Sequence, residues 1–169
     1  MSRKKFIIIT IIVLIINYLL DFITKQYAIT HLKGNAPVYY LYDTIMIYYI
    51  ENSGAFLSMG SNWPIAVKYI LLAALPIAFC LYGIYYCLVK EKNVTRIILF
   101  ATIIAGGLGN LVDRLLNDFK VVDFLNFGIG NLRTGILNVA DLSVTFGAII
   151  LVIYEFRQSK KNKLSVADE

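Results

Sequence analysis

The sequence predicts an all-α integral membrane protein with four transmembrane helices, and three observations support this fold class. Hydrophobic residues make up 59% of the 169 residues, only 16% are charged, and the mean hydropathy is +0.69. A soluble domain carries about 25% charged residues. Four long apolar segments approach the roughly 20 residues that a spanning helix needs. Most basic residues lie before the first segment, between the second and third, and after the fourth. If all four segments cross the membrane, these three regions are on the same side.

The four apolar segments give the expected helices, at about residues 6–28, 64–89, 97–116 and 137–156. The second and fourth segments reach spanning length easily, whereas the first and third reach it only with polar residues near one end. The N-terminal "MSRKK" followed by an apolar run also resembles a secretory signal peptide. No small-x-small cleavage pattern follows it, so we expect a retained first helix.

Lysine and arginine predict the orientation of these helices. Ten of the 16 basic residues lie at the N-terminus, between the second and third helices, and in the tail: Arg3, Lys4, Lys5, Lys90, Lys92, Arg96, Arg157, Lys160, Lys161 and Lys163. The positive-inside rule makes that side cytoplasmic, so both termini are expected there. The net charge of +5 is therefore explained by topology, and we expect no nucleic acid as a partner.

The segments outside the helices differ from one another. Residues 36–60 contain "VYYLY" and "TIMIYYIEN", whose β-branched and aromatic residues predict a small extracytoplasmic β-sheet or hairpin. Residues 115–133 are expected to form a short interfacial segment, with room for a short helix. Residues 158–169 read as a disordered tail. The whole chain, 1–169, is expected to be one membrane-embedded domain.

Asp141 lies inside the fourth apolar segment, and a carboxylate at membrane depth costs roughly 2.5–3.5 kcal/mol. The predicted helix directions place the other costly polar residues at the same outer level. They are Asp21, Lys25, Asn110, Asp113, Arg114, Asp123 and Asn138. Scattered substitutions would not be expected to converge in this way, so this level is the predicted functional site.

A structural explanation competes with this one. Asp21 and Lys25 are spaced for an i,i+4 ion pair, Arg114 can reach headgroups, and Asn138 can cap the fourth helix. Intramembrane carboxylates also mark proton relays, so a small proton- or ion-coupled transporter is an alternative, as is a non-catalytic scaffold. A transporter is expected to place its site near the midplane between repeated halves, and no repeat is visible here.

Two neighbouring carboxylates have a specific chemical use. They share a proton, so that one acts as a general base on water while the other, protonated, polarises a carbonyl group. That chemistry hydrolyses peptide bonds. No metal-ligand spacing is apparent, and we expect no cofactor. His31 reads as a surface residue, and Cys80 and Cys87 as packing residues.

Five motifs resemble those of the lipoprotein signal peptidases, the bacterial aspartyl peptidases also called signal peptidase II. They are "DFITK", "ENSGAF", "GGLGNLVDR", "VVDF" and "NVAD", in that order along the chain. The resemblance implies that Asp123 and Asp141 are catalytic. It implies binding or supporting roles for Asp21, Lys25, Asn52, Gly54, Gly109, Asn110, Asp113, Arg114, Asn138 and Ala140. The sequence departs from the usual pattern at Phe119, where the family often has glycine.

The resemblance also implies a substrate and a location. The expected substrates are prolipoproteins that carry a diacylglyceryl group on the cysteine after the cleavage site, and the expected cut lies just before that cysteine. The enzyme would be a multi-pass protein of the bacterial inner membrane, with its site on the extracytoplasmic side. Membrane lipids are the other expected partners, and nothing in the sequence demands more than a monomer.

Overall fold

In the computed structural model, residues 1–55 and 58–167 are described, with side chains up to residue 163. Four helices are long and apolar enough to cross a membrane, as the sequence predicts. The first is α1 (Arg3–His31) and the third is α4 (Val94–Leu116). The second is continuous from Ile65 to Lys90 and comprises α2 (Ile65–Lys68), η2 (Tyr69–Ala74), α3 (Leu75–Tyr85) and η3 (Tyr86–Lys90). The fourth is α5 (Val139–Ala167).

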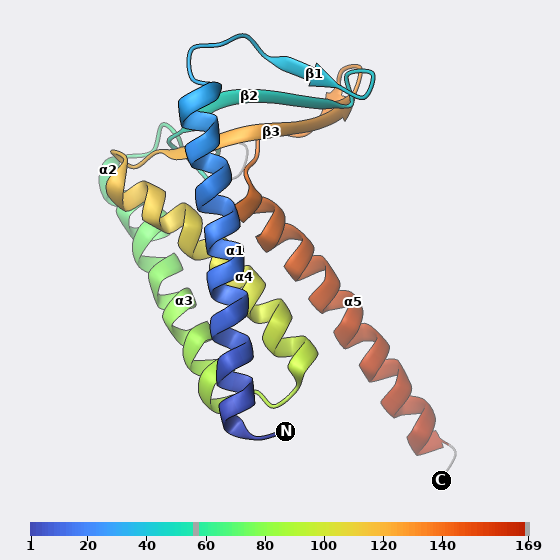
Figure 1. The fold of residues 1–169 in the computed structure, drawn as a ribbon. Coiled ribbons are helices and arrows are strands. Elements are labelled where there is room, and N and C mark those ends of the chain that lie inside the picture. Colours follow the sequence, from blue (N-terminus) through green and yellow to red (C-terminus); the bar gives the residue numbers. More distant parts are fainter. Residues whose placement is uncertain (56–57, 168–169) are drawn as a thin grey trace.

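The helix ends differ from the predicted ones mainly at α5. The apolar run predicts an end near residue 156 and a disordered tail from about 158, whereas the structure continues the helix to Ala167. Hydropathy marks only the part of a helix that lipid can surround. The following residues, "RQSKKNK", are polar but are mostly good helix formers, so the backbone continues in the same conformation. Figure 1 shows this end of α5 projecting beyond the other helices.

Helix α4 is the centre of the bundle. It packs against α1, α3 and α5, which surround it in Figure 1. In the most apolar 18-residue stretch of α4, 44% of the residues are buried, compared with 11–17% in the corresponding stretches of the other three helices. The remaining apolar surface of those three helices faces outward, as expected when the solvent is lipid.

Small residues on α4 allow this close packing. A Cβ on Gly106 would collide with the backbone carbonyl oxygen of Ala140, and one on Gly109 would lie 2.5 Å from Oδ2 of Asp21. On α5, a Cβ on Gly147 would lie 2.8 Å from Cγ1 of Ile103. Glycine therefore lets α1 and α5 approach α4 at the level where the polar side chains gather.

A four-stranded antiparallel sheet covers one end of the bundle (Figure 1). Its strands are β1 (Val38–Tyr40), β2 (Ile45–Asn52), β3 (Val121–Ile129) and β4 (Leu132–Arg133), in that order across the sheet. The hairpin predicted within residues 36–60 is thereby confirmed as β1 and β2. The remaining two strands come from the segment between α4 and α5.

The interfacial segment expected in residues 115–133 has room for a short helix, but beyond the end of α4 it forms a turn and the strands β3 and β4. The residues "VVDFLNF" form β3 because their β-branched and aromatic side chains suit a strand that pairs with β2. Ile50 lies opposite Asp123 and Asn52 lies opposite Val121. This pairing joins segments that are about 70 positions apart in the chain, so local patterning gave no sign of it.

The turn from α4 into β3 is backbone-strained. Asp118 and Phe119 adopt φ of 49° and 64°, and this left-handed region costs a non-glycine residue about 1–2 kcal/mol. Phe119 is buried, and its ring makes an edge contact with Tyr69 at 4.9 Å between centroids. Burial of that ring offsets the backbone cost.

We expect Gly106→Ala to destabilise the protein, because its new methyl group would displace the backbone at Ala140. Overpacking of this kind costs about 1–3 kcal/mol, so the melting temperature in detergent should fall by several degrees. Gly107→Ala is the matched control, since its nearest neighbour is only the Cys80 sulfur at 3.2 Å. Equal melting temperatures for the two variants would contradict this account of the packing.

Candidate functional site

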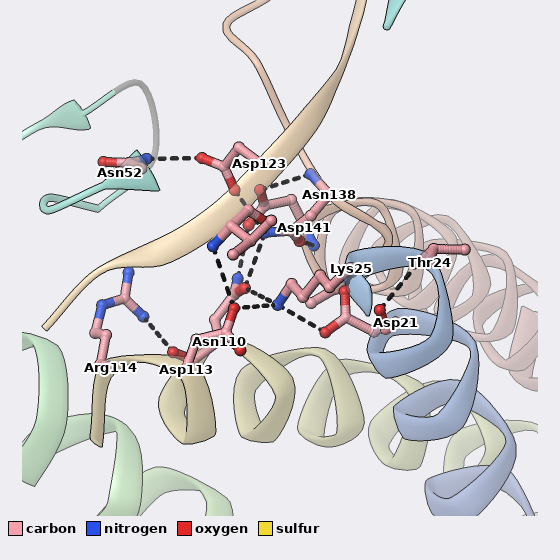
Figure 2. A network of polar contacts seen from close by, with 12 residues as sticks. Asp21, Thr24, Lys25, Asn52, Asn110, Asp113, Arg114, Asp123, Asn138 and Asp141 are labelled. Carbon is pink, nitrogen blue, oxygen red and sulfur yellow. Dashed lines mark hydrogen bonds and ion pairs between the residues drawn. The ribbon is translucent and has the colours of Figure 1, made fainter. Parts of the chain in front are cut away.

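The two aspartates predicted to act together lie on either side of one asparagine, between the sheet and the helices (Figure 2). Asp123 is on β3, and Asp141 is in the first turn of α5. Nδ2 of Asn138 donates to Oδ1 of Asp123 at 2.6 Å, and the backbone N–H of Asn138 donates to Oδ2 of Asp141 at 3.2 Å. Asn138 therefore holds both carboxyl groups at one place.

Asn138 and Asp141 also cap α5. The Asn138 side chain accepts a hydrogen bond from the backbone N–H of Asp141 at 2.8 Å, and the Asp141 carboxylate reaches back to the Asn138 N–H. This reciprocal pair is a capping box. Because the helix N-terminus carries partial positive charge, the cap also stabilises Asp141 as an anion. The helix-capping role considered for Asn138 thus coexists with its contact to Asp123.

Asp123 is only 2% exposed and is held by a second asparagine. Nδ2 of Asn52 donates to Oδ2 of Asp123 at 2.9 Å. Asn52 is itself fixed, because its Oδ1 accepts from the Gly54 N–H at 2.9 Å and its Nδ2 also donates to the Ala55 carbonyl at 3.1 Å. Burial and the charge of Asp141 raise the pKa of Asp123 to about 7, even though both asparagine donors lower it.

Asn110 connects Asp141 to the other side of the site. Its Nδ2 donates to Oδ1 of Asp141 at 2.8 Å, and its Oδ1 accepts from Nδ2 of Asn138 and from Nζ of Lys25, both at 3.0 Å. A lysine ammonium can only donate, so the contact to Lys25 fixes which end of the Asn110 amide faces Asp141.

Lys25 is almost fully buried and has three partners. Its ammonium lies 2.7 Å from Oδ2 of Asp21 and 2.9 Å from Oδ2 of Asp113, and it donates to Asn110. The i,i+4 pair with Asp21 forms, as the spacing allows. The pair is also part of the wider network, since it touches Asn110 directly.

The two aspartates paired with Lys25 anchor the elements that carry the catalytic candidates. Oδ1 of Asp21 accepts from the backbone N–H of Ala140 at 2.8 Å, next to Asp141. Oδ2 of Asp113 accepts from the backbone N–H of Val122 at 3.2 Å, next to Asp123. Ala140 is completely buried, and Gly109 leaves the space that the Asp21 carboxylate occupies.

Arg114 lies beside the site and bonds to neither aspartate. Its Nη2 donates to the Gly54 carbonyl at 2.9 Å and its Nη1 to the Asn110 carbonyl at 3.2 Å. Its Nε is buried and has no hydrogen-bond partner among the described residues. Gly54 is required by the loop, because a Cβ there would lie 2.6 Å from backbone atoms of Ser58 and Met59. The Nε–H of Arg114 is thus a cationic donor that remains available at the site.

The structure brings all the predicted site residues into this one region, although Gly54, Gly109 and Ala140 contribute backbone or space instead of side chains. Sequence reasoning missed Val122, whose N–H bonds to Asp113 and whose carbonyl accepts from Asn138 at 3.3 Å. Both groups belong to the backbone, and only the position next to Asp123 could have suggested them. Among the described side chains, no cluster of three or more His, Cys, Asp or Glu could hold a metal ion.

The arrangement can move protons to and from a water molecule. Burial raises the pKa of one carboxyl group, Asp123, to about 7, while the carboxylate of Asp141 accepts from the backbone N–H at the start of α5. Asn110 and Asn138 orient the Asp141 carboxylate. Two carboxyl groups in different settings therefore lie at one place.

The chain is similar in sequence to proteins of a known family. A sequence model of the family described as "Signal peptidase (SPase) II" matches residues 6–157. The lipoprotein signal peptidase of Borreliella burgdorferi (strain ZS7) is 34% identical over 165 residues, which cover 95% of both chains. That of Chlorobium phaeobacteroides (strain BS1) is 38% identical over 146 residues, covering 80% of this chain and 87% of the relative.

The fold has a match among solved structures as well. A bacterial membrane enzyme determined by the in meso method aligns with a TM-score of 0.79, covering 90% of each chain at 24% identity. Four apolar helices and this likeness make the protein a multi-pass membrane protein. From the family match and the relatives' identities, the chain belongs to the signal peptidase II family.

Proposed function

We propose that the chain is an aspartyl endopeptidase that removes the signal peptide from diacylglyceryl-modified prolipoproteins, cutting just before the lipid-modified cysteine. Family membership supports the removal of signal peptides from prolipoproteins. The observation that carries the catalytic assignment is the bridging of Asp123 and Asp141 by Asn138. Prolipoproteins and membrane lipids are its partners, and it acts as a monomer.

The two aspartates have different roles in this mechanism. The Asp141 carboxylate takes a proton from water, whose oxygen attacks the scissile carbonyl carbon. Asp123, as the acid, gives its proton to the carbonyl oxygen. Asp141 then passes its proton to the amide nitrogen, the C–N bond breaks, and the collapsing hydroxyl returns a proton to Asp123. Asp123 thus ends the cycle protonated and Asp141 ends it ionised, as each began.

Neighbouring donors orient the substrate. The Nε of Arg114 has no partner among the described residues, so it can donate to the substrate backbone or the developing oxyanion. Asn52 already uses both hydrogens of its amide, on Asp123 and on the Ala55 carbonyl, so it positions Asp123. Asp21, Lys25 and Asp113 act through Asn110 and through the backbone beside each aspartate. They are positioning residues and do not touch the reacting atoms.

The basic residues support an orientation with both termini in the cytoplasm and the sheet on the extracytoplasmic side of the inner membrane. The site then lies at the outer leaflet, where the lipid-modified cysteine of a substrate would be held. A transporter finds no support, because the family match is to peptidases and the carboxyl groups of Asp123 and Asp141 belong to β3 and to the first turn of α5, beside the sheet.

We expect Asp123→Asn and Asp141→Asn each to lower cleavage of a diacylglyceryl-modified prolipoprotein by roughly 10³-fold or more, because an amide can serve neither as acid nor as base. Cleavage by purified protein in detergent, followed by gel shift of the product, measures this. Asp118→Asn is the matched control, since that carboxylate is exposed and asparagine tolerates its positive φ. A folded dyad variant that cleaves at the wild-type rate would remove that residue from the mechanism.

The pH dependence follows from the pKa of Asp123, about 7. Above that pH the acid loses its proton, so kcat/KM should fall about tenfold per pH unit. A pH–rate profile from pH 5 to 9 measures this, with thermal melting as the test of folding at each pH. A profile that stays flat to pH 9 would contradict the assignment of Asp123 as the acid.

Stability gives an independent readout of the same group. The folded-state pKa of Asp123 lies above its ordinary value of 3.8. Its contribution to stability is therefore fully present below about pH 4 and is lost as the pH rises through about 7. The melting temperature of the wild type should fall relative to that of Asp123→Asn over this window, whether or not the cleavage assay works.

Asn138 variants separate capping from positioning. Asn138→Ser keeps an oxygen that can cap α5 but loses the donor to Asp123, so kcat should fall about 10–100-fold with little loss of stability. Asn138→Ala loses both functions and should cost about 1 kcal/mol more in stability. Steady-state kinetics and melting curves of the two variants measure this. If Asn138→Ser were as active as wild type, the donor to Asp123 would be dispensable.

A further inference from the structure

An apolar groove lies on the face of α4 that its three neighbours leave open. It has a volume of about 350 Å³ and is lined only by apolar and aromatic residues of α3, η3, α4 and α5. Phe79 and Tyr82 form one wall, Phe100 and Ile103 the floor, and Ala148 and Val152 the other wall. No group in the proposed mechanism uses this groove.

The groove is open because α3 and α5 both pack on α4 but, among the described residues, have few or no contacts with each other. Ile104 of α4 faces Gly83 on α3, and Ile103 of α4 faces Gly147 on α5. Figure 1 shows α5 leaning away from α3 toward its C-terminal end. On the opposite side α1 packs on both α4 and α5, so that side is closed.

The groove leads to the catalytic candidates. Ile103, Gly107, Asn110 and Arg114 follow one another at spacings of four, three and four residues, so they share one face of α4. Ile103 precedes Asn110 by seven residues and Ala148 follows Asp141 by seven, which is about 10 Å along each helix at 1.5 Å per residue. The groove is therefore about two helical turns from the dyad.

We propose that this groove binds the apolar helix of the substrate's signal peptide. The inference rests on the proposed function and deepens it by naming where the substrate helix lies. A signal peptide has an apolar core of about 7–15 residues shortly before its cleavage site. When the scissile bond is at the dyad, that core must run alongside α4 and α5 in the membrane. The groove is the open face at that depth, and the small side chain of Ala148 leaves room for a helix to approach.

Site-specific photocrosslinking tests the placement. Benzoylphenylalanine is introduced at Ile103 or Val152 in the groove, in the Asp123→Asn background, so that the prolipoprotein substrate stays uncleaved. Ile15 is the matched control, because it is 51% exposed on α1 and precedes Asp21 by six residues, which gives a similar depth. We expect crosslinks to the signal peptide from the two groove positions and none from Ile15. Crosslinks to phospholipid alone at the groove, or to the signal peptide from Ile15 alone, would overturn the proposal.

Kinetics of groove-filling variants give a second test in the active enzyme. Ala148→Trp should raise KM by about tenfold while kcat changes less than about threefold, because the indole fills the groove and leaves the dyad intact. Ile149→Trp, at the adjacent exposed position, should leave both constants unchanged. Equal KM values for the two variants would overturn the groove assignment. Failure of the wild type to cleave would instead overturn the proposed function, so the two failures are distinguishable.

Discussion

The burial of one lysine ammonium determines how the rest of the site is built. Lys25 is 2% exposed, and a cation in that position is strongly unfavourable unless its charge is matched and its donors are used. Asp21, Asp113 and Asn110 supply these contacts from α1 and α4. Asp21 and Asn110 then bond to groups on α5, which carries Asp141. Asp113 bonds to a backbone N–H on β3, which carries Asp123. Neutralising Lys25 thus fixes four elements at one level.

Asn138 resolves a conflict between capping and catalysis. In a capping box the carboxylate accepts from the backbone N–H of the N-cap residue, here Asn138, which fixes one of its oxygens and leaves the other for other partners. In Asp141 this other oxygen accepts from Asn110, so the carboxylate is oriented by two helices. Asp123 has no helix N-terminus beside it, and its burial and the charge of Asp141 raise its pKa to about 7, although the amide donors of Asn52 and Asn138 lower it. The chemical difference between the two aspartates arises from their backbone settings.

Much of this could be predicted from the sequence, because lipid makes polar residues conspicuous. Asp21, Lys25, Asn110 and Asp141 stand out in apolar runs, and the helix directions place them at one level. The strand β3 could not be predicted, since its partner β2 lies about 70 residues earlier and pairing depends on the folded chain. The bridging by Asn138 was hidden for the same reason: a cap is visible in the sequence, whereas a contact to Asp123 needs the sheet in place. The backbone groups of Val122 carry no signal in their side chain.

The position of the sheet explains how a hydrolase can work in a lipid solvent. An open sheet has unpaired backbone groups at its edges, which hydrocarbon does not tolerate, so β1 to β4 must lie at the membrane–water boundary. Asp123 belongs to this sheet, whereas Asp141 belongs to a membrane helix. The dyad therefore joins the wet and the apolar parts of the protein.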